Sequence, residues 1–253
     1  MKSTKIKNVI LGTGRPKVAV PMTGITEQKI LEEAKEIVAK KPDIIEWRID
    51  FFQDVTDIVK LKGVTAKLRK IIKDTALLIT FRTYREGGNL KLSDEKYFSI
   101  VRALIENNLG DAVDLERYHD EAELTALLTL SKANHVIVIM SNHDFHKTPS
   151  KNNIIERLQS MEQLGADIAK IAVMPTNRKD VLELLAATQE ASENIDIPII
   201  TMSMGDLGKI SRICGEAFGS CLTFASVTAA SAPGQIELNH LRQELDDLKI
   251  ADL

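Results

Sequence analysis

Short apolar runs rich in Val, Ile and Leu recur along this chain about every 25 to 30 residues, and a longer amphipathic segment follows each run. The runs that fit buried strands are residues 18–21, 44–48, 76–82, 112–116, 136–141, 168–174, 197–204 and 222–227. Between them, segments such as 27–39 and 181–191 place apolar residues near the 3.6-residue period of an amphipathic helix. This alternation predicts an α/β fold in which helices cover a parallel sheet.

Eight strand–helix units within 253 residues predict a closed (β/α)8 barrel, or TIM barrel, rather than an open sheet. No linker rich in Pro, Gly or Ser interrupts the pattern, so we expect one domain over residues 1–253. Residues 6–11 and 17–20, on either side of Gly12-Thr13-Gly14, are expected to form a hairpin that closes the N-terminal end of the barrel. The GTGRPK stretch lacks the third glycine of a dinucleotide-binding motif and precedes a strand, so it predicts no nucleotide cofactor.

Charge and cysteine content narrow the class of partner. The formal net charge is -3 and the Lys and Arg residues are scattered, which indicates a small-molecule partner rather than nucleic acid. Cys214 and Cys221 lack the spacing of a zinc site or a disulfide framework, and we expect two buried, reduced thiols. There is no signal-peptide pattern and no run of about 18 apolar residues, so we predict a cytoplasmic protein without a membrane segment.

Lys170 interrupts the apolar run 168–174 near its centre. A charged amine inside a buried strand is unfavourable unless it is paired or neutral, so burial favours the neutral form. A neutral lysine can attack a carbonyl group and form an iminium. The alternative is a lysine that reaches solvent from the strand end or pairs with a carboxylate, and the residues alone leave both possibilities open.

His143 follows the run 136–141 directly, which places an imidazole at the carboxyl end of a strand. Active sites of (β/α)8 barrels form at this end, and the ordinary pKa of histidine suits a general acid or base. A histidine that only hydrogen-bonds its own loop is equally compatible with this position. His119 and His146 lie further along loops and are expected to be ordinary surface residues.

Charged residues also cluster at two other strand ends. Glu46, Arg48 and Asp50 alternate at period two, so we expect their side chains to share one face of a strand. Arg82 ends the run 76–82, and Glu86 follows in a loop with two glycines. These charges fit either a ligand site or a structural network of salt bridges at the mouth of the barrel.

The C-terminal part of the chain adds a cation and a small-residue loop. Arg212 lies in a segment, 208–212, that begins a predicted helix after the seventh strand, where its planar guanidinium can hold a carboxylate through two hydrogen bonds. The loop 231–235, from Ser231 to Gln235, has the composition of a loop that closes over a ligand, although an ordinary turn before the last helix has a similar composition.

Taken together, these segments resemble those of the type I 3-dehydroquinate dehydratases. The matching strings are EWRID at 46–50, TFR at 80–82, EGG at 86–88, SNHDFHKTP at 141–149, GADIAKIAVMP at 165–175, TMSMG at 201–205, ISR at 210–212 and SAPGQ at 231–235. They occur in family order across nearly the whole chain and lie at predicted strand ends.

The resemblance implies an enzyme that converts 3-dehydroquinate to 3-dehydroshikimate in the shikimate pathway, without a metal or organic cofactor and commonly as a homodimer. It implies that Lys170 forms a Schiff base, that His143 is the general acid/base and that Glu86 orients this histidine. The implied substrate-binding residues are Glu46, Arg48, Arg82, Arg212, Ser231 and Gln235, with Arg212 as the partner of the substrate carboxylate. Pro21 stands where some family members have a substrate-contacting serine, so that contact is not carried over.

Three other functions share some of these features. An aldolase or transaldolase would also use a strand lysine, but it would cleave a carbon–carbon bond. A non-catalytic barrel acting as a sensor or pseudoenzyme would be expected to lack Lys170 or His143, and both are present. A metal-dependent hydrolase would need an H-x-H pattern or clustered His and Asp ligands at strand ends, which the sequence does not have.

Overall fold

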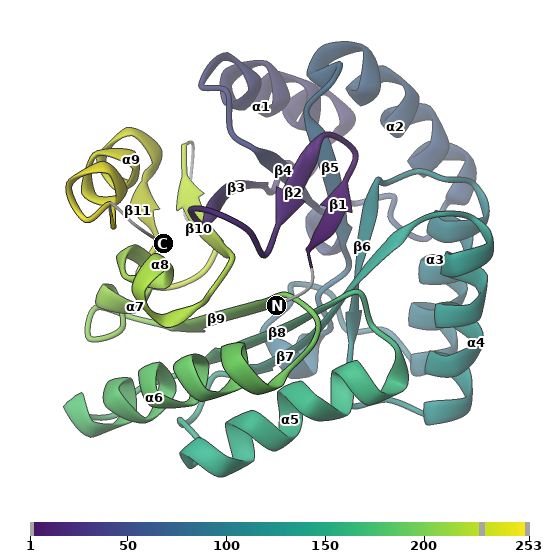
Figure 1. Cartoon of the computed structure of the whole chain (residues 1–253). Coiled ribbons are helices and arrows are strands. Elements are labelled where there is room, and N and C mark those ends of the chain that lie inside the picture. The colour runs from purple at the N-terminus through teal and green to yellow at the C-terminus, as the bar shows by residue number, and fades with distance from the viewer. Residues whose placement is uncertain (1–2, 228–230, 251–253) are drawn as a thin grey trace.

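A curled parallel sheet surrounded by helices forms the body of the computed structural model, which describes residues 3–227 and 231–250 (Figure 1). Its strand order is β11-β10-β3-β4-β5-β6-β7-β8-β9, and all neighbouring pairs are parallel. The strands are β3 (Lys17–Met22), β4 (Ile44–Arg48), β5 (Ala76–Thr80), β6 (Ala112–Glu116), β7 (Ile137–Asp144), β8 (Ile168–Val173), β9 (Ile199–Ser203), β10 (Leu222–Ser226) and β11 (Ile236–Glu237).

The curled sheet closes where β9 meets the start of β10. The backbone N–H of Cys221 donates to the carbonyl oxygen of Ile199 at 2.9 Å, and the Ser220 hydroxyl accepts from the backbone N–H of Thr201 at 3.0 Å. The ring of strands from β3 to β10 therefore closes through a few bonds rather than through a full ladder. The predicted (β/α)8 barrel is confirmed.

Helices follow the strands along the chain. They are α1 (Glu27–Ala39), α2 (Ile58–Ile72), α3 (Asp94–Glu106), α4 (Glu121–Ala133), α5 (Lys151–Leu164), α6 (Arg178–Asn194), α7 (Ile210–Ile213), α8 (Gly215–Phe218) and α9 (Leu238–Asp247). Each of the first six begins at a side chain that accepts a hydrogen bond from the first turn, which satisfies an otherwise unpaired backbone N–H. These capping residues are Thr26, Asp57, Ser93, Asp120, Ser150 and Asn177.

Side chains alternate between two cores along each strand. On β8, Ala169 and Ile171 pack outward in the large core shared with the helices, whereas Ile168 lies in a second core inside the barrel. The inner positions change character along the strands, because Ile168 is followed on the same face by Lys170, and on β6 Ala112 is followed by Asp114. The N-terminal half of the interior is therefore apolar, whereas charged side chains join the apolar ones in the carboxyl half.

A short hairpin closes the apolar end of the barrel, as predicted, but its strands are not the ones we predicted. β1 (Thr4–Ile6) pairs with β2 (Val9–Leu11), and Lys7 in the turn has a positive φ of 55°. Residues 17–20 are part of β3 instead. They cannot pair with residues 6–11, because the two edges of β3 are occupied by β4 and β10. Ile6, Val9 and Leu11 of the hairpin pack in the inner core with the first residues of the barrel strands.

Several predicted boundaries shift by a few residues, and two shifts affect the site. β7 extends to Asp144, so His143 lies within the strand rather than after it. Asp50 lies in a 3-10 helix, η1 (Ile49–Phe51), rather than on the strand with Glu46 and Arg48. The short strand β11 was not predicted, and it lies directly before the last helix.

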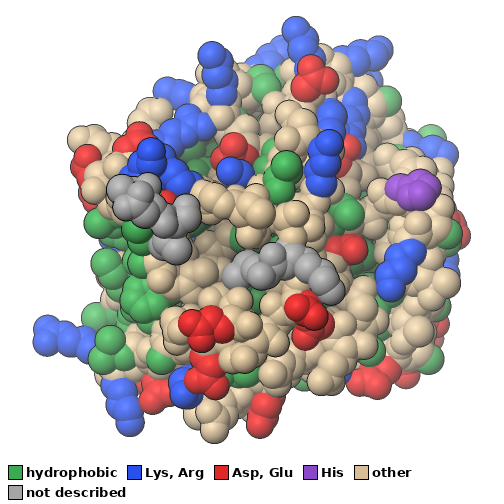
Figure 2. All heavy atoms as spheres, in the orientation of Figure 1, with side chains coloured by type: hydrophobic (Ala, Val, Ile, Leu, Met, Phe, Trp, Pro, Cys, Tyr) green, Lys and Arg blue, Asp and Glu red, His purple; other side chains and the backbone are tan. Residues whose placement is uncertain are grey.

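The surface carries mixed charge, and the two cysteines differ in burial. Both signs of charge occur on the face shown in Figure 2, with Lys and Arg more frequent in its upper part and Asp and Glu in its lower part. Cys221 is buried and Cys214 is only half-buried, and both are free thiols. Of the helices in the described residues, none is long and apolar enough to cross a membrane.

Candidate active site

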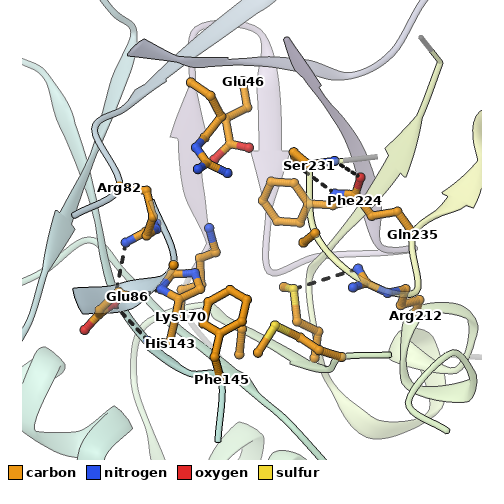
Figure 3. Close-up of a pocket in the computed structure, with 16 residues that line it drawn as sticks. Glu46, Arg82, Glu86, His143, Phe145, Lys170, Arg212, Phe224, Ser231 and Gln235 are labelled. Atoms are coloured by element: carbon orange, nitrogen blue, oxygen red, sulfur yellow. Dashed lines mark hydrogen bonds and ion pairs between the residues drawn. The ribbon is translucent and has the colours of Figure 1, made fainter. Parts of the chain in front are cut away.

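The carboxyl end of the barrel holds a pocket of about 490 Å³ (Figure 3). All nine site residues predicted from the sequence line it, although they come from segments as far apart as β4 and the loop before β11. The lining also contains a mainly apolar set: Gly87, Phe145, Ala172, Met202, Met204, Phe224 and Ala232. The pocket therefore combines several convergent charges with an apolar wall, as small-molecule sites commonly do.

Lys170 points into this pocket from the middle of β8 and is only 3% exposed. Its Nζ lies 3.4 Å from Asp114 Oδ2 and 4.6 Å from the centre of the Phe224 ring. The side chain does not reach outward to solvent among the helices. The sequence left open whether Lys170 reaches solvent or pairs with a carboxylate. The structure shows that it pairs with Asp114.

His143 is held by the carboxylate of Glu86. Glu86 Oε2 lies 2.9 Å from His143 Nδ1 and accepts the backbone N–H of the same residue at 2.9 Å. Glu86 Oε1 accepts a hydrogen bond of 3.0 Å from Asn142 Nδ2. In the described part of the chain, no hydrogen-bond partner reaches His143 Nε2, so this nitrogen is left to face the pocket.

Burial shifts both members of this pair away from their charged forms. Desolvation lowers the pKa of His143 well below its usual value, and the positive charges of Arg82 and Lys170 act in the same direction. Desolvation, with the nearby charge of Glu116, raises the pKa of Glu86 to about 8, against the opposing effect of Arg82. Burial thus favours a neutral imidazole, and the contact of 2.9 Å between Nδ1 and Oε2 holds a single proton.

Two glycines explain how the loop after β5 brings Glu86 over β7. Glu86 ends the 3-10 helix η2 (Tyr84–Glu86), and Gly87 follows it with a positive φ of 82°. A Cβ atom on Gly88 would lie 1.9 Å from the carbonyl oxygen of Arg82, so only glycine permits this close approach. The EGG string is therefore a requirement of backbone geometry as well as a family resemblance.

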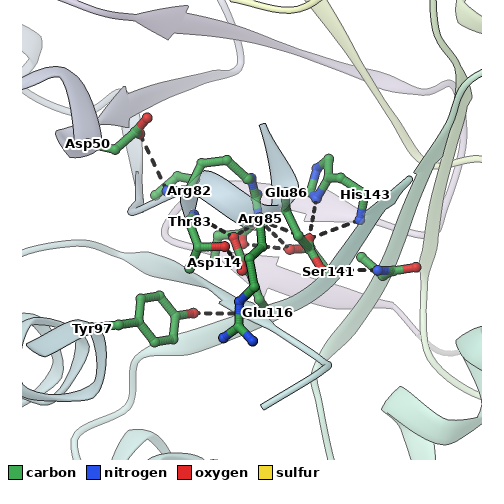
Figure 4. Close-up of polar contacts among 12 residues, drawn as sticks. Asp50, Arg82, Thr83, Arg85, Glu86, Tyr97, Asp114, Glu116, Ser141 and His143 are labelled. Carbon is green, nitrogen blue, oxygen red and sulfur yellow. Dashed lines mark hydrogen bonds and ion pairs between the residues drawn. The ribbon is translucent and has the colours of Figure 1, made fainter. Parts of the chain in front are cut away.

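Arg82 lies at the centre of a buried charge network (Figure 4). Its NH2 group is 2.9 Å from Asp114 Oδ2, and its NH1 group is 2.8 Å from Glu116 Oε1 and 3.6 Å from Glu86 Oε2. NH1 also donates to the Ser141 hydroxyl at 3.0 Å. Burial opposes the charge of Arg82, but the three carboxylates raise its pKa well above the usual value, so it remains a cation.

Asp114 and Glu116 were not recognised as site residues from the sequence. Burial opposes their negative charges, yet the neighbouring Arg82 holds the pKa of each below its usual range. Thr83 fixes Glu116 further, because its backbone N–H and its hydroxyl donate to the two carboxylate oxygens at 2.8 and 2.6 Å. The available signal was their period-two spacing within the buried run AVDLE, the same signal that drew attention to Glu46 and Arg48.

The β4 residues are partly paired with each other. Arg48 donates two hydrogen bonds, of 2.8 and 2.9 Å, to the two carboxylate oxygens of Asp50, despite the location of Asp50 beyond the strand. Glu46 accepts a hydrogen bond of 2.8 Å from the Thr80 hydroxyl and has no cation within salt-bridge distance in residues 3–227 and 231–250. Of this group, Glu46 retains the most capacity for a ligand.

Arg212 differs from the other cations of the pocket because no carboxylate of the described residues forms an ion pair with it, although it is only 2% exposed. Its NH2 group donates to the carbonyl oxygen of Pro233 at 2.9 Å, and its buried Nε has no hydrogen-bond partner among residues 3–227 and 231–250. Burial lowers its pKa to about 10, so it is still charged at neutral pH. A buried, uncompensated cation that lines a pocket is suited to an anionic ligand.

The loop 231–235 packs directly on Arg212. The Pro233 carbonyl oxygen that accepts from Arg212 also accepts the backbone N–H of Gly205 at 3.2 Å. Gln235 is bonded to Ser231 at both ends of its amide, as an acceptor from the backbone N–H at 2.9 Å and a donor to the hydroxyl at 3.2 Å. Ser231 and Gln235 thus face the pocket as a bonded pair.

The prediction for one of the remaining histidines was wrong. The side chain of His119 is only 2% exposed, stacks on Tyr97 with ring centres 4.7 Å apart and lies 3.4 Å from Glu116 Oε2. Its burial follows from the aromatic residues of α3, which its position in a loop could not reveal. His146 is exposed, as predicted.

Comparison with known proteins adds an independent result. The model of the type I 3-dehydroquinase family matches residues 18–252. A 3-dehydroquinate dehydratase of Lactiplantibacillus plantarum is 54% identical over 97% of this chain and 98% of its own length, and one of Clostridium kluyveri is 50% identical over 95% of each. The crystal structure of a type I 3-dehydroquinate dehydratase from Clostridium difficile with covalent modified comenic acid has a TM-score of 0.94 and 46% identity, covering 98% of this chain and 97% of that one.

Proposed function

The chain belongs to the type I 3-dehydroquinase family, whose members dehydrate 3-dehydroquinate in the shikimate pathway, and we propose that it does so through an imine at Lys170. It is accordingly an enzyme of the lyase class. The observation that carries the proposed mechanism is the presence in one pocket of a buried lysine and a histidine whose Nδ1 is held by Glu86. The covalent modification in the structure from Clostridium difficile is consistent with such chemistry.

Lys170 supplies the covalent step. The neutral amine attacks the ketone carbon of 3-dehydroquinate, and the resulting carbinolamine takes up a proton from solvent as it loses water, which leaves a protonated imine. This cation withdraws electrons more strongly than the ketone did, so the proton on the adjacent C2 carbon becomes more acidic. Departure of that proton gives an enamine, in which the electron pair is delocalised onto nitrogen.

His143 supplies the proton transfers. Its Nε2 faces the pocket and, with the neutral imidazole favoured by burial, takes the C2 proton. The enamine then expels the C1 hydroxyl, which leaves as water with the proton that the imidazole has just received. Hydrolysis of the conjugated imine releases 3-dehydroshikimate and restores the amine, so the net change is the loss of one water molecule. Glu86 keeps Nδ1 oriented throughout.

The remaining lining residues bind substrate in this proposal. Arg212 holds the substrate carboxylate, because this buried cation has no anionic partner in the described parts of the chain. Glu46, Arg48, Ser231 and Gln235 offer acceptors and donors to the hydroxyl groups of the substrate. Arg82 has the least free capacity of the set, since NH1 and NH2 already bond to Asp114, Glu116 and Ser141.

Borohydride reduction tests the covalent step. Incubation with 3-dehydroquinate and borohydride should inactivate the enzyme and add the mass of the reduced adduct to Lys170. Lys170→Ala should not be trapped and should lose at least about 10⁴-fold in kcat, as expected when a covalent nucleophile is removed. His143→Ala is the matched control, because it should still be trapped but lose most of its turnover, measured by the ultraviolet absorbance of the conjugated product. Retention of turnover by Lys170→Ala would refute the covalent route.

Other expectations from the sequence stay predictions. These are the homodimer, the cytoplasmic location and a single domain over residues 1–253. The aldolase, sensor and hydrolase alternatives do not agree with the family to which the chain belongs.

A further inference from the structure

Asp114 is the carboxylate that contacts the reacting amine, and neither the family resemblance nor the proposed mechanism gives it a role. It is 1% exposed, and it lies on β6 with its side chain inside the barrel. Its Oδ2 contacts Lys170 Nζ at 3.4 Å and Arg82 NH2 at 2.9 Å, while Oδ1 accepts a hydrogen bond of 2.6 Å from the Ser141 hydroxyl. All three neighbours are buried, so water does not screen these contacts.

We propose that Asp114 is a positioning residue that serves as the counter-ion of Lys170, both for the resting ammonium and for the protonated imine. This inference rests on the proposed imine at Lys170. The charges support it, because the overall conversion of an ammonium and a ketone into a protonated imine and water leaves one positive charge on nitrogen at both ends. A single fixed carboxylate beside Nζ therefore suits the starting state and the intermediate alike.

The neutral amine exists only between these two states, when the ammonium has given its proton to solvent and has not yet attacked. A strong, exclusive counter-ion would oppose this deprotonation. Asp114 is not exclusive, because Arg82 and Ser141 bond to the same carboxylate and withdraw part of its charge from Lys170. Asp114 thus holds the amine in place while it shares its charge with Arg82 and Ser141.

Other charged groups also face Lys170 across the pocket, and they must be considered in any pH dependence. They are Glu46 and Arg48 from β4, Arg82 from the segment after β5, Glu86 from η2, His143 from β7 and Arg212 from α7. Within the described residues, Asp114 provides the carboxylate oxygen that lies within 4.0 Å of Nζ. β10 contributes the uncharged ring of Phe224.

The pH dependence of trapping tests this role in a way that loss of packing would not. In Asp114→Asn the ammonium loses its counter-ion and Arg82 becomes a stronger repulsive neighbour, so the neutral amine should form at lower pH. The rate of inactivation by 3-dehydroquinate and borohydride is measured as a function of pH. The acid limb of this profile should move to lower pH by about one unit or more. kcat should fall by at least about tenfold, because the protonated imine is less stabilised.

For Ser141→Ala we expect the acid limb to shift in the opposite direction. This variant serves as a second test if Asp114→Asn does not fold. Removal of the hydroxyl takes a hydrogen bond from Asp114 and makes its carboxylate a stronger counter-ion. The acid limb should then move to higher pH, by a few tenths of a unit. Glu116→Gln is the matched control, because Glu116 bonds to the same Arg82 from the same strand but does not contact Lys170, and its acid limb should stay near that of the parent.

The outcomes separate this inference from the proposed function. If the parent enzyme is not trapped at Lys170, the proposed mechanism fails. If the parent is trapped but both Asp114→Asn and Ser141→Ala keep its acid limb, the counter-ion role of Asp114 is wrong and the mechanism stands. A shift of equal size and sign in Glu116→Gln would also overturn the inference, because it would locate the effect in Arg82 rather than in the contact with Lys170.

Discussion

On the side of the pocket formed by β5 to β8, the guanidinium of Arg82 lies among three carboxylates, whereas on the α7 side the guanidinium of Arg212 forms no ion pair with any described residue. Both side chains are almost completely buried. Within the part of the chain that the structure describes, the same chemical group is therefore electrostatically compensated on one side of the pocket and uncompensated on the other.

The two arginines differ in what they can do: Arg82 organises its side of the pocket, and Arg212 is available to bind an anionic ligand. The carboxylates around Arg82 hold Lys170 and His143 in place before any ligand arrives, which is the preorganisation that a covalent mechanism needs. On the α7 side, burial has removed water from Arg212 without supplying an anion, so a ligand carboxylate gains the full interaction. Three substitutions test this difference between the two arginines.

The largest effect is expected for Arg82→Met. Three carboxylates would lose their shared cation, and breaking a buried ion pair in this way costs about 3–5 kcal/mol in the free energy of unfolding. Urea denaturation monitored by circular dichroism measures this loss. Arg69→Met is the control, since the 2.6 Å ion pair of Arg69 with Asp111 is partly exposed and should contribute about 1 kcal/mol or less. Similar losses in the two variants would mean that the network around Arg82 does not stabilise the fold.

A different result is expected for Arg212→Met. The free energy of unfolding should stay within about 1 kcal/mol of the parent, because a buried cation without a counter-ion gives little stability to lose. KM for 3-dehydroquinate should rise by about 100-fold, as expected when a charge-assisted bidentate contact is removed. A substrate analogue without the carboxylate sharpens the assignment, because it should bind the parent and the variant equally well. A marked preference of this analogue for the parent would show that Arg212 binds some other group.

The smallest effect is expected in the pH dependence of stability at Glu86. Its folded pKa of about 8 lies above its ordinary value of 4.5, so the folded chain holds a proton that the unfolded chain releases. The associated stability is fully present below about pH 4.5 and is lost as pH rises through about 8. Glu86→Gln cannot ionise, so its free energy of unfolding should rise relative to that of the parent as pH increases over this range, by about 1 kcal/mol or more. A difference that is constant from pH 5 to pH 8 would contradict the raised pKa.

The proposed catalytic pair shows how far sequence reasoning could go. Lys170 lies at an inner position in the middle of β8 and His143 at one near the end of β7, so the barrel pattern alone brings both to one mouth. Asp114 follows the same period-two rule on β6, yet a carboxylate in a strand gives no sign of which cation it meets. Its contact with Lys170 spans 56 residues of sequence and depends on the register of β6, β7 and β8.

From the sequence alone, the order of the apolar runs determined the strand–helix pattern. The alternation of side chains also determined which end of the barrel bears the charges, because both features depend on local spacing. Tertiary structure decided the rest. The pairing of the N-terminal hairpin depended on which strand edges were free, and the burial of His119 depended on the aromatic residues that cover it. The division between a compensated Arg82 and an uncompensated Arg212 arises only in three dimensions, because electrostatic partners are set by distance in space rather than by position along the chain.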